Sequence, residues 1–316
     1  MEINFEHFQI AFQAVVPLFV LMGAGVVTKQ MKLLTPAELV RVNRMVFHVF
    51  YSVMMFYNMV TTNIVETFRP RLIVFAVAGV ALTYLASVLF TLAVEKSPKR
   101  RGAMIQALYR SNFVLIGIPL VATLFGDSEI AVTTMLIAIV VPIYNVVAVV
   151  TLESFRGGKV NVLKVLKDVF KNPMIVGALA GLLCLLAGVT FPQCVLKPLG
   201  QITAATTPVA LIVLGASFRL GSTQEHLPQL VACVAGRLVI IPAVALGAAY
   251  YLGFRGVEFA TLVSIFATPC AVASFAMAQQ MDSDAELAGN AVVFTSALSI
   301  VTIFFWILLF KSLGAF

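Results

Sequence analysis

The residues that could carry out acid–base, nucleophilic or metal chemistry are few in this 316-residue chain. It has three histidines (His7, His48 and His226) and four cysteines, and none is spaced as in C-x-x-C or H-x-x-x-H motifs. The usual metal and redox sites are therefore not expected. No Asp or Glu falls in the middle of a long apolar stretch. We expect no enzyme, no bound cofactor and no metal centre.

Two polar interruptions of apolar segments stand out instead. Residues 111–120 read SNFVLIGIPL, and residues 267–274 read ATPCAVAS. A proline removes one backbone donor, and in lipid every backbone polar group must be satisfied within the protein. Helices that break at Pro119 and Pro269 would expose half-helix N-termini, which suit an anion. Plain proline kinks are the alternative interpretation.

The composition indicates what kind of helix must position these residues. The chain is 61% hydrophobic and 11% charged, with a mean hydropathy of +1.02, whereas soluble domains carry about 25% charged residues. Apolar blocks of about 20 residues match the length of a membrane-spanning helix. The pattern predicts an all-α polytopic membrane protein with ten spans. Their cores are expected at 9–28, 41–60, 72–94, 104–125, 130–152, 173–191, 201–218, 229–252, 257–279 and 287–310.

The net charge of +7 indicates orientation, not nucleic-acid binding. Most Lys and Arg residues follow the odd-numbered spans, as in EKSPKRR at 95–101 and in the stretch 153–173. The positive-inside rule places these loops in the cytoplasm and both termini outside. The N-terminus lacks a basic signal-peptide region, so the first span is expected to be retained.

The basic stretch also divides the chain into two halves. We expect a first repeat at 1–154, a cytoplasmic linker at 155–171 and a second repeat at 172–316. Five spans in each half require opposite orientations, as in inverted-repeat transporters. FGDSEIA before span 5 and DSDAELA before span 10 are a faint internal match. Residues 160–170 are either a short helix on the membrane surface or a solvated linker.

Several segments resemble one known family. The Asn…Gly-x-Pro-Leu pattern of SNFVLIGIPL is similar to that of the auxin efflux carrier family. Further similar segments follow the family's order along nearly the whole chain. They are VNRMVFHVF, IYNVVAVVTLE, KNPMIVGALAGLL, TPVALIVLGASF, GRLVIIP and TPCAVASFAMAQQM. The chain departs from the family pattern at 113–115, which are apolar here, and at Ser52, where many members have proline.

The resemblance implies a secondary carrier of organic anions, with a fold shared by the bile acid sodium symporters. Spans 1, 2, 6 and 7 would form a scaffold part, and the other six a transport part. Spans 4 and 9 would cross at their prolines, with substrate beside the crossing. Plant members export auxin, whereas bacterial members are associated with malonate or malate. The compact length resembles bacterial members, so we expect a permease of the bacterial inner membrane.

The expected substrate-binding residues surround the two breaks, together with one intramembrane arginine. They are Asn112, Gly117, Pro119, Thr268, Pro269, Cys270, Ser274 and Arg237. Each also has a structural interpretation, because Asn, Ser and Thr often bond to helix backbones or to neighbouring helices. For Arg237 the alternatives are snorkelling or an ion pair with Glu153. Arg110 is expected at the membrane interface, and His48 in a helix–helix hydrogen bond.

The expected partners are a small organic anion and the lipid bilayer, and a homodimer is left open. The coupling ion is Na⁺, H⁺ or none. Rival hypotheses are a carrier of an aromatic or auxin-like carboxylate by uniport or efflux, and a membrane sensor on the same fold. A channel would show a repeated polar stripe, which the sequence lacks.

Overall fold

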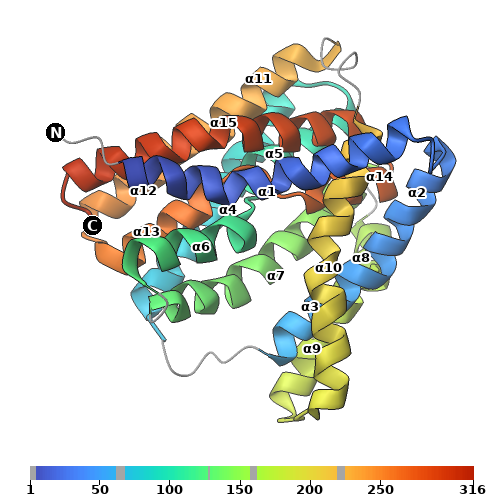
Figure 1. The fold of residues 1–316 in the computed structure, drawn as a ribbon, viewed down its shortest axis with the longest axis horizontal. Helices are drawn as coiled ribbons and strands as arrows, with labels where there is room; N and C mark the ends of the chain where they lie inside the picture. The colour runs from blue at the N-terminus through green and yellow to red at the C-terminus, as the bar shows by residue number, and fades with distance from the viewer. Residues whose placement is uncertain (1–4, 62–67, 127–128, 157–161, 219–224) are drawn as a thin grey trace.

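The computed structural model describes residues 5–61, 68–126, 129–156, 162–218 and 225–316 (Figure 1). Every regular element in these ranges is helical, which confirms the all-α prediction. The α-helices are α1 Phe5–Gln30, α2 Pro36–Met45, α3 Tyr51–Val60, α4 Pro70–Val94, α5 Pro98–Tyr109, α6 Phe113–Phe125, α7 Ile130–Ser154, α8 Val162–Lys171, α9 Pro173–Leu186, α10 Gln193–Ser217, α11 Leu227–Ala235, α12 Ile241–Tyr251, α13 Gly256–Phe266, α14 Ala273–Gln280 and α15 Ala285–Ser312. Two π-helical segments, η1 Val46–Phe50 and η4 Gly236–Ile240, join α2 to α3 and α11 to α12.

Five helical segments of the described chain are long and apolar enough to cross a membrane. They are Pro70–Val94, Ile130–Ser154, Gln193–Ser217, Leu227–Tyr251 and Ala285–Ser312. Other apolar helices are shorter, including α6, α9 and α13. The chain is thus a multi-pass membrane protein, and the ten-span inverted repeat stays a prediction.

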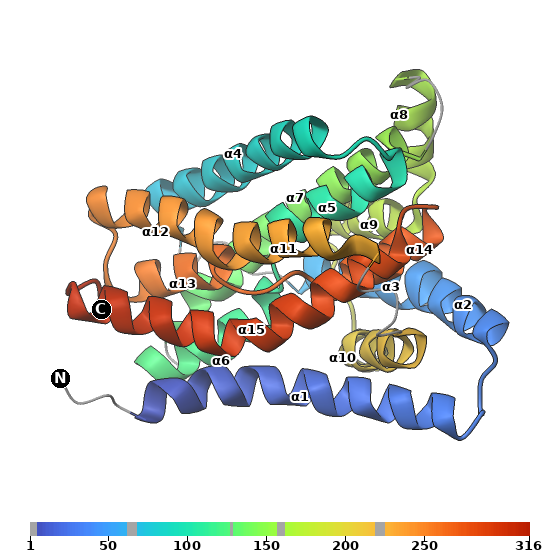
Figure 2. The same cartoon turned by 90° about the horizontal axis from the view of Figure 1, so that it is seen from above.

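Glycines bring two pairs of helices into close contact. A Cβ on Gly25 of α1 would clash with the carbonyl oxygen of Ile212 in α10, and one on Gly215 would clash with that of Met22. Small residues let helix backbones approach in this way within a membrane. In Figure 2, α1 runs along one side of the molecule past the end of α10.

The second close pair is α3 with α9. Gly177 and Gly181 of α9 lie against the backbone of Ser52 and Phe56, so that a Cβ on either would clash there. In both views α2, α3 and α9 gather at one end of the molecule, and α12 and α13 lie at the other.

Two broken helices cross in the interior of the fold. One consists of α5 and α6, separated by residues 110–112, and the other of α13 and α14, separated by residues 267–272. Residues 102–113 and 259–278 are buried without interruption. Irregular backbone at membrane depth is tolerated only where protein or a cavity covers it, and here protein covers both breaks.

The expected break at Pro119 is wrong. Pro119 lies inside α6, and the first helix breaks seven residues earlier, before Phe113. Pro269 does lie in the second break, between α13 and α14. A proline within a membrane helix can be accommodated by its neighbours, so its presence does not fix the site of the break.

The central linker is partly helical. Of the two interpretations of residues 160–170, the short helix is observed as α8, Val162–Lys171, and its place on the membrane surface stays a prediction. Residues 157–161 of the linker, including Lys159, lie outside the described residues, as do Asp127 and Ser128 of the FGDSEIA turn and Arg219.

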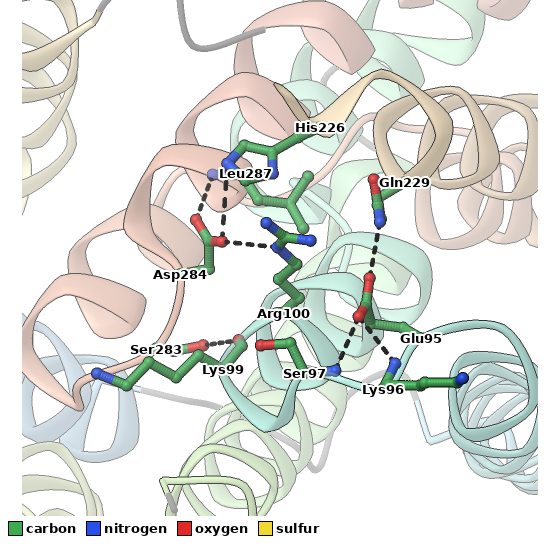
Figure 3. Close-up of polar contacts among 10 residues, drawn as sticks. All are labelled: Glu95, Lys96, Ser97, Lys99, Arg100, His226, Gln229, Ser283, Asp284 and Leu287. Atoms are coloured by element: carbon green, nitrogen blue, oxygen red, sulfur yellow. Dashed lines mark hydrogen bonds and ion pairs between the residues drawn. The ribbon is translucent and has the colours of Figure 1, made fainter. Parts of the chain in front are cut away.

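A polar cluster joins the starts of α5, α11 and α15 (Figure 3). Asp284 accepts a hydrogen bond from the Leu287 amide at 2.9 Å and so caps α15. Its other carboxylate oxygen lies 3.7 Å from Nε of Arg100 and 3.8 Å from Nε2 of His226. The cluster thereby connects three segments that are distant in the sequence.

Glu95 anchors the neighbouring part of the same cluster. Its carboxylate accepts 2.8 Å hydrogen bonds from the amides of Lys96 and Ser97, and one of 2.7 Å from the side chain of Gln229. Burial alone raises the pKa of this carboxyl, but these hydrogen bonds and the charge of Arg100 outweigh it and hold the pKa below its usual range.

Candidate functional site

The two broken helices are joined by their main chains. The Asn112 amide donates to the carbonyl of Pro269 at 2.8 Å, and the Ala271 amide donates to the carbonyl of Arg110 at 3.2 Å. Ser111 and Cys270 form an isolated antiparallel bridge between these bonds. The amide of Cys270 donates to the hydroxyl of Thr295 in α15 at 3.1 Å. The crossing therefore satisfies part of its own freed backbone.

A cavity of about 80 Å³ lies against the crossing. Its wall comes from α3, the two breaks, the first turns of α6 and α14, α7 and α10. The lining residues are Tyr51, Met54, Met55, Asn58, Arg110, Ser111, Asn112, Phe113, Val114, Leu115, Val141, Tyr144, Asn145, Thr207, Ala271, Val272 and Ala273. Two helix N-termini, with their partial positive charge, thus border one small cavity.

Arg110 is the cation of this cavity, and its expected place at the membrane interface is wrong. Its side chain is 4% exposed. The guanidinium donates to Gln106 at 3.3 Å, to the sulfur of Met277 at 2.7 Å and to the amide oxygen of Asn145. The helix begins at Pro98, about 18 Å before Arg110 at 1.5 Å per residue. The arginine is therefore deep in the fold, and no carboxylate is among these partners.

Asn112 is the one expected site residue that lines this cavity. It occupies the position before the first residue of α6 and is 7% exposed. Its side-chain nitrogen is buried and has no hydrogen-bond partner among the described residues. An unpaired buried donor costs free energy, so this amide is available to an acceptor in the cavity.

The other expected residues in or near the breaks contribute to packing. Gly117 lets α6 approach Ser264 of α13, because a Cβ would lie 3.0 Å from that of Ser264. Pro119 lies farther along α6. Thr268 donates its hydroxyl to the Ser264 carbonyl one turn back at 2.7 Å. None of Gly117, Pro119 or Thr268 lines the 80 Å³ cavity.

The remaining expected residues of the second break are buried next to the cavity without lining it. Pro269 contributes the carbonyl that Asn112 bonds. Cys270 is fully buried and its thiol lies 3.7 Å from the carbonyl of Ala271. Ser274 is 1% exposed, in the first turn of α14.

Arg237 neither snorkels nor pairs with Glu153. It is fully buried, and its guanidinium donates to the main-chain carbonyls of Thr268 and Ile265 at 2.8 Å. It does not line the 80 Å³ cavity. His48 also departs from expectation, because it is exposed and its Nδ1 lies 2.9 Å from the Arg44 carbonyl of its own helix.

A second cavity of about 180 Å³ continues from the first. The two share Met55, Asn58, Val114 and Val141. The second extends to Thr61 at the end of α3, and its wall is mostly apolar. Together they form a polar head at the crossing and an apolar extension.

Sequence reasoning missed several polar residues of the site. Arg110 and Ser111 precede Asn112 directly, and Tyr144 and Asn145 lie in α7. The Ser111 hydroxyl donates to that of Tyr144 at 3.1 Å. Three consecutive polar residues, Arg110–Asn112, inside a buried stretch were the available signal, because intramembrane charge is costly without a function.

Comparison with known proteins agrees with this architecture. The family model for membrane transport proteins matches residues 10–164 and 158–307. An uncharacterized transporter of Methanocaldococcus jannaschii is 22% identical over 258 residues, which cover 79% of this chain and 81% of the relative. An uncharacterized transporter of Methanothermobacter thermautotrophicus is 28% identical over 108 residues, which cover 34% of this chain and 36% of that relative. The chain therefore belongs to the membrane transport protein family, the auxin efflux carrier family of transporters.

Proposed function

We propose that this chain is a secondary carrier of small organic anions, with the substrate carboxylate bound beside Arg110 and Asn112. Short mono- or dicarboxylates such as malonate or malate are the proposed substrates. The observation that carries this proposal is the buried guanidinium of Arg110 on the cavity wall, whose hydrogen-bond partners among the described residues are all neutral. A buried charge without a counter-charge is strongly destabilising, and a bound carboxylate would supply one.

The neighbouring groups also favour an anion. The free amide of Asn112 and the N-termini of α6 and α14 border the same cavity. Helix N-termini attract negative charge. A cavity of 80 Å³ has room for a carboxylate group, since one water needs only about 10–15 Å³ on this measure.

Alternating access follows from the proposed inverted repeat, and the helix pairing supports that repeat. Span 1 packs on span 7 as α1 on α10, and span 2 packs on span 6 as α3 on α9. A two-fold axis that exchanges spans 1 and 6, and spans 2 and 7, converts one pair into the other. The proposed scaffold part is α1–α3, α9 and α10. The transport part would move against it in the bacterial inner membrane, with both termini outside.

An aromatic carboxylate is the second candidate. The continuing cavity contains Met55, Met59 and Ile118, and methionine adapts readily to flat apolar ligands. The third candidate is a sensor that binds the acid without transporting it. The experiment described next distinguishes it from a carrier.

The test is uptake of labelled malonate, malate and an aromatic carboxylate into proteoliposomes, under Na⁺, H⁺ and voltage gradients in turn. Wild-type protein should show saturable uptake of one acid, and Arg110→Gln should abolish it. Arg255→Gln is the matched control, because Arg255 is exposed and does not line the cavity; its guanidinium bonds to the carbonyls of Tyr250 and Phe254 and lies over the Tyr250 ring. Binding without uptake would favour the sensor. Folded protein that binds no carboxylate would refute the proposal.

A further inference from the structure

Arg237 has a set of partners that the proposed substrate site does not explain. It is fully buried, in the π-helical segment η4. Nε donates to Thr268 and Nη2 to Ile265, both at 2.8 Å, and Nη1 donates to Leu108 and Tyr109, both at 3.2 Å. All four acceptors are main-chain carbonyls, which together form what we call the carbonyl cage.

These carbonyls are free because both helices break. In an intact α-helix, the carbonyl of Ile265 would accept from residue 269, but Pro269 has no N–H. The carbonyl of Leu108 would accept from the amide of Asn112, which instead donates to Pro269. The guanidinium therefore replaces hydrogen bonds that the crossing itself removes.

The charges also match. The carbonyl cage lies at the C-terminal ends of α5 and α13, with Thr268 two residues beyond α13, and each helix C-terminus carries about half a negative elementary charge. Together they amount to about one negative charge, and the guanidinium supplies one positive charge. Unwound carbonyls and half-helix C-termini of this kind hold the coupling cation in some transporters.

We propose that Arg237 is a built-in cation, whose guanidinium permanently fills the carbonyl cage so that no free cation binds there. The inference rests on the proposed function in one respect. The carbonyl cage lies where α5 and α13 end, and the helices that follow the two breaks, α6 and α14, begin at the proposed anion cavity. Arg237 is thus a positioning residue, which fixes both breaks so that Arg110 and Asn112 face one cavity.

The surroundings hold Arg237 in place. A Cβ on Gly236 would clash with the side chain of Leu108, so glycine lets η4 reach the crossing. The indole N–H of Trp306 donates to the Leu238 carbonyl at 2.9 Å, within the same π-helical segment. Both contacts fix the segment that carries the guanidinium.

Chemical rescue tests this role. Arg237→Ala should lower the melting temperature of the detergent-solubilised protein by about 5 °C or more, and millimolar guanidinium should restore part of the loss. The same salt should leave wild-type protein and Arg255→Ala unchanged. Guanidinium should also restore the maximal uptake rate of Arg237→Ala in proteoliposomes, which a general loss of packing would not allow.

Two further variants keep the test informative if Arg237→Ala does not fold. Arg237→Lys keeps the charge and should be more stable than Arg237→Met, which fills similar space without charge. Equal or greater stability of Arg237→Met would overturn the inference, as would a folded Arg237→Ala whose melting temperature does not respond to guanidinium.

A sodium titration is a further test. If Na⁺, but not choline, stabilised wild-type protein saturably, and Arg237→Lys lost this effect, a free cation would bind in the cage and the inference would be overturned. These melting experiments need no substrate, so a failure of the proposed function would not be mistaken for a failure of this inference.

Discussion

The amide nitrogen of Asn112 lies 2.8 Å from the carbonyl oxygen of Pro269, although the two residues belong to helices 157 positions apart in the chain. This bond directs the main chain of Asn112 toward the second break and leaves its side chain on the cavity wall. A second hydrogen bond joins the same two breaks, because the carbonyl of the neighbouring Arg110 accepts from the Ala271 amide. The same three-residue break thus holds the crossing and faces the proposed substrate.

Asn112→Asp should abolish carboxylate uptake, because a fixed carboxylate beside Arg110 would take the place of the substrate. Asn112→Ala should reduce uptake less, since it removes only the amide. The control is Asn172→Asp, because Asn172 has the same 7% exposure and caps α9, a position that Asp also suits. Uptake rates in proteoliposomes provide the measurement. Normal uptake by Asn112→Asp would contradict the proposed site.

Replacing the two prolines should have unequal effects. Pro269→Ala supplies an N–H that competes with Arg237 for the carbonyl of Ile265, so melting temperature and uptake should both fall. Pro119→Ala lies within α6, away from the crossing, and should retain most of the uptake. The opposite order would mean that the break depends on Pro119 after all.

Two glycines of α1 provide a matched test of the contact with α10. Gly25→Ala places a methyl group against the backbone of Ile212, and overpacking of this kind costs about 1–3 kcal/mol. Gly23→Ala meets nothing within 4 Å and should be neutral or slightly stabilising. Thermal unfolding in detergent distinguishes them. Equal melting temperatures would indicate that α1 and α10 separate easily.

Glu95 should make the folded state sensitive to acid. Its pKa is lower in the folded protein than the usual 4.5, so its stabilising effect is present above about pH 4.5 and is lost as the pH falls through the folded-state value. Glu95→Gln should therefore melt below wild-type protein at pH 7, and the difference should shrink under acid conditions. Glu286→Gln, which changes an exposed carboxyl of α15, is the control. A difference that is constant with pH would exclude this linkage.

Native cysteines test the proposed orientation. Cys194 is exposed near the start of α10, on the side expected to be outside, whereas Cys233 and Cys270 are fully buried. A membrane-impermeant maleimide should label Cys194 in intact cells, and Cys194→Ser should remove that signal. Lys167→Cys in the same background should react only after permeabilisation, because α8 is expected in the cytoplasm. Reversed accessibility would invert the topology.

The sequence predicts some parts of this fold better than others. Broken helices are predicted from Asn, Gly and Pro in apolar segments, although Gly117 and Pro119 both continue the helix within α6. The position of the first break does not follow, since Pro119 is accommodated within α6 while the chain opens at 110–112. The position of the first break depends on the second broken helix, because the carbonyl of Pro269 there accepts the hydrogen bond of the Asn112 amide.

The two buried arginines illustrate the same limit. Arg110 is expected at the membrane interface from the sequence because it opens the fourth apolar span, yet the helix that it ends begins much earlier, at Pro98. Arg237 is predicted as a ligand for an anion because its charge lies deep in an apolar span. Its guanidinium instead bonds to main-chain carbonyls, and the side-chain sequence does not show which carbonyls are free. Charge is visible in a sequence, but the atoms that neutralise it are not.

The crossing is held by main-chain bonds, from Asn112 to Pro269 and from Ala271 to Arg110. Side chains at 113–115 and 271–273 line the cavity but do not supply these bonds. The side chains at these positions are therefore separate from the main-chain atoms that join the two helices, and Ala271 alone belongs to both sets. We expect a library of variants at these six positions to change which ligand the proposed site accepts while the joint between the helices remains, so the crossing is a starting point for redesign.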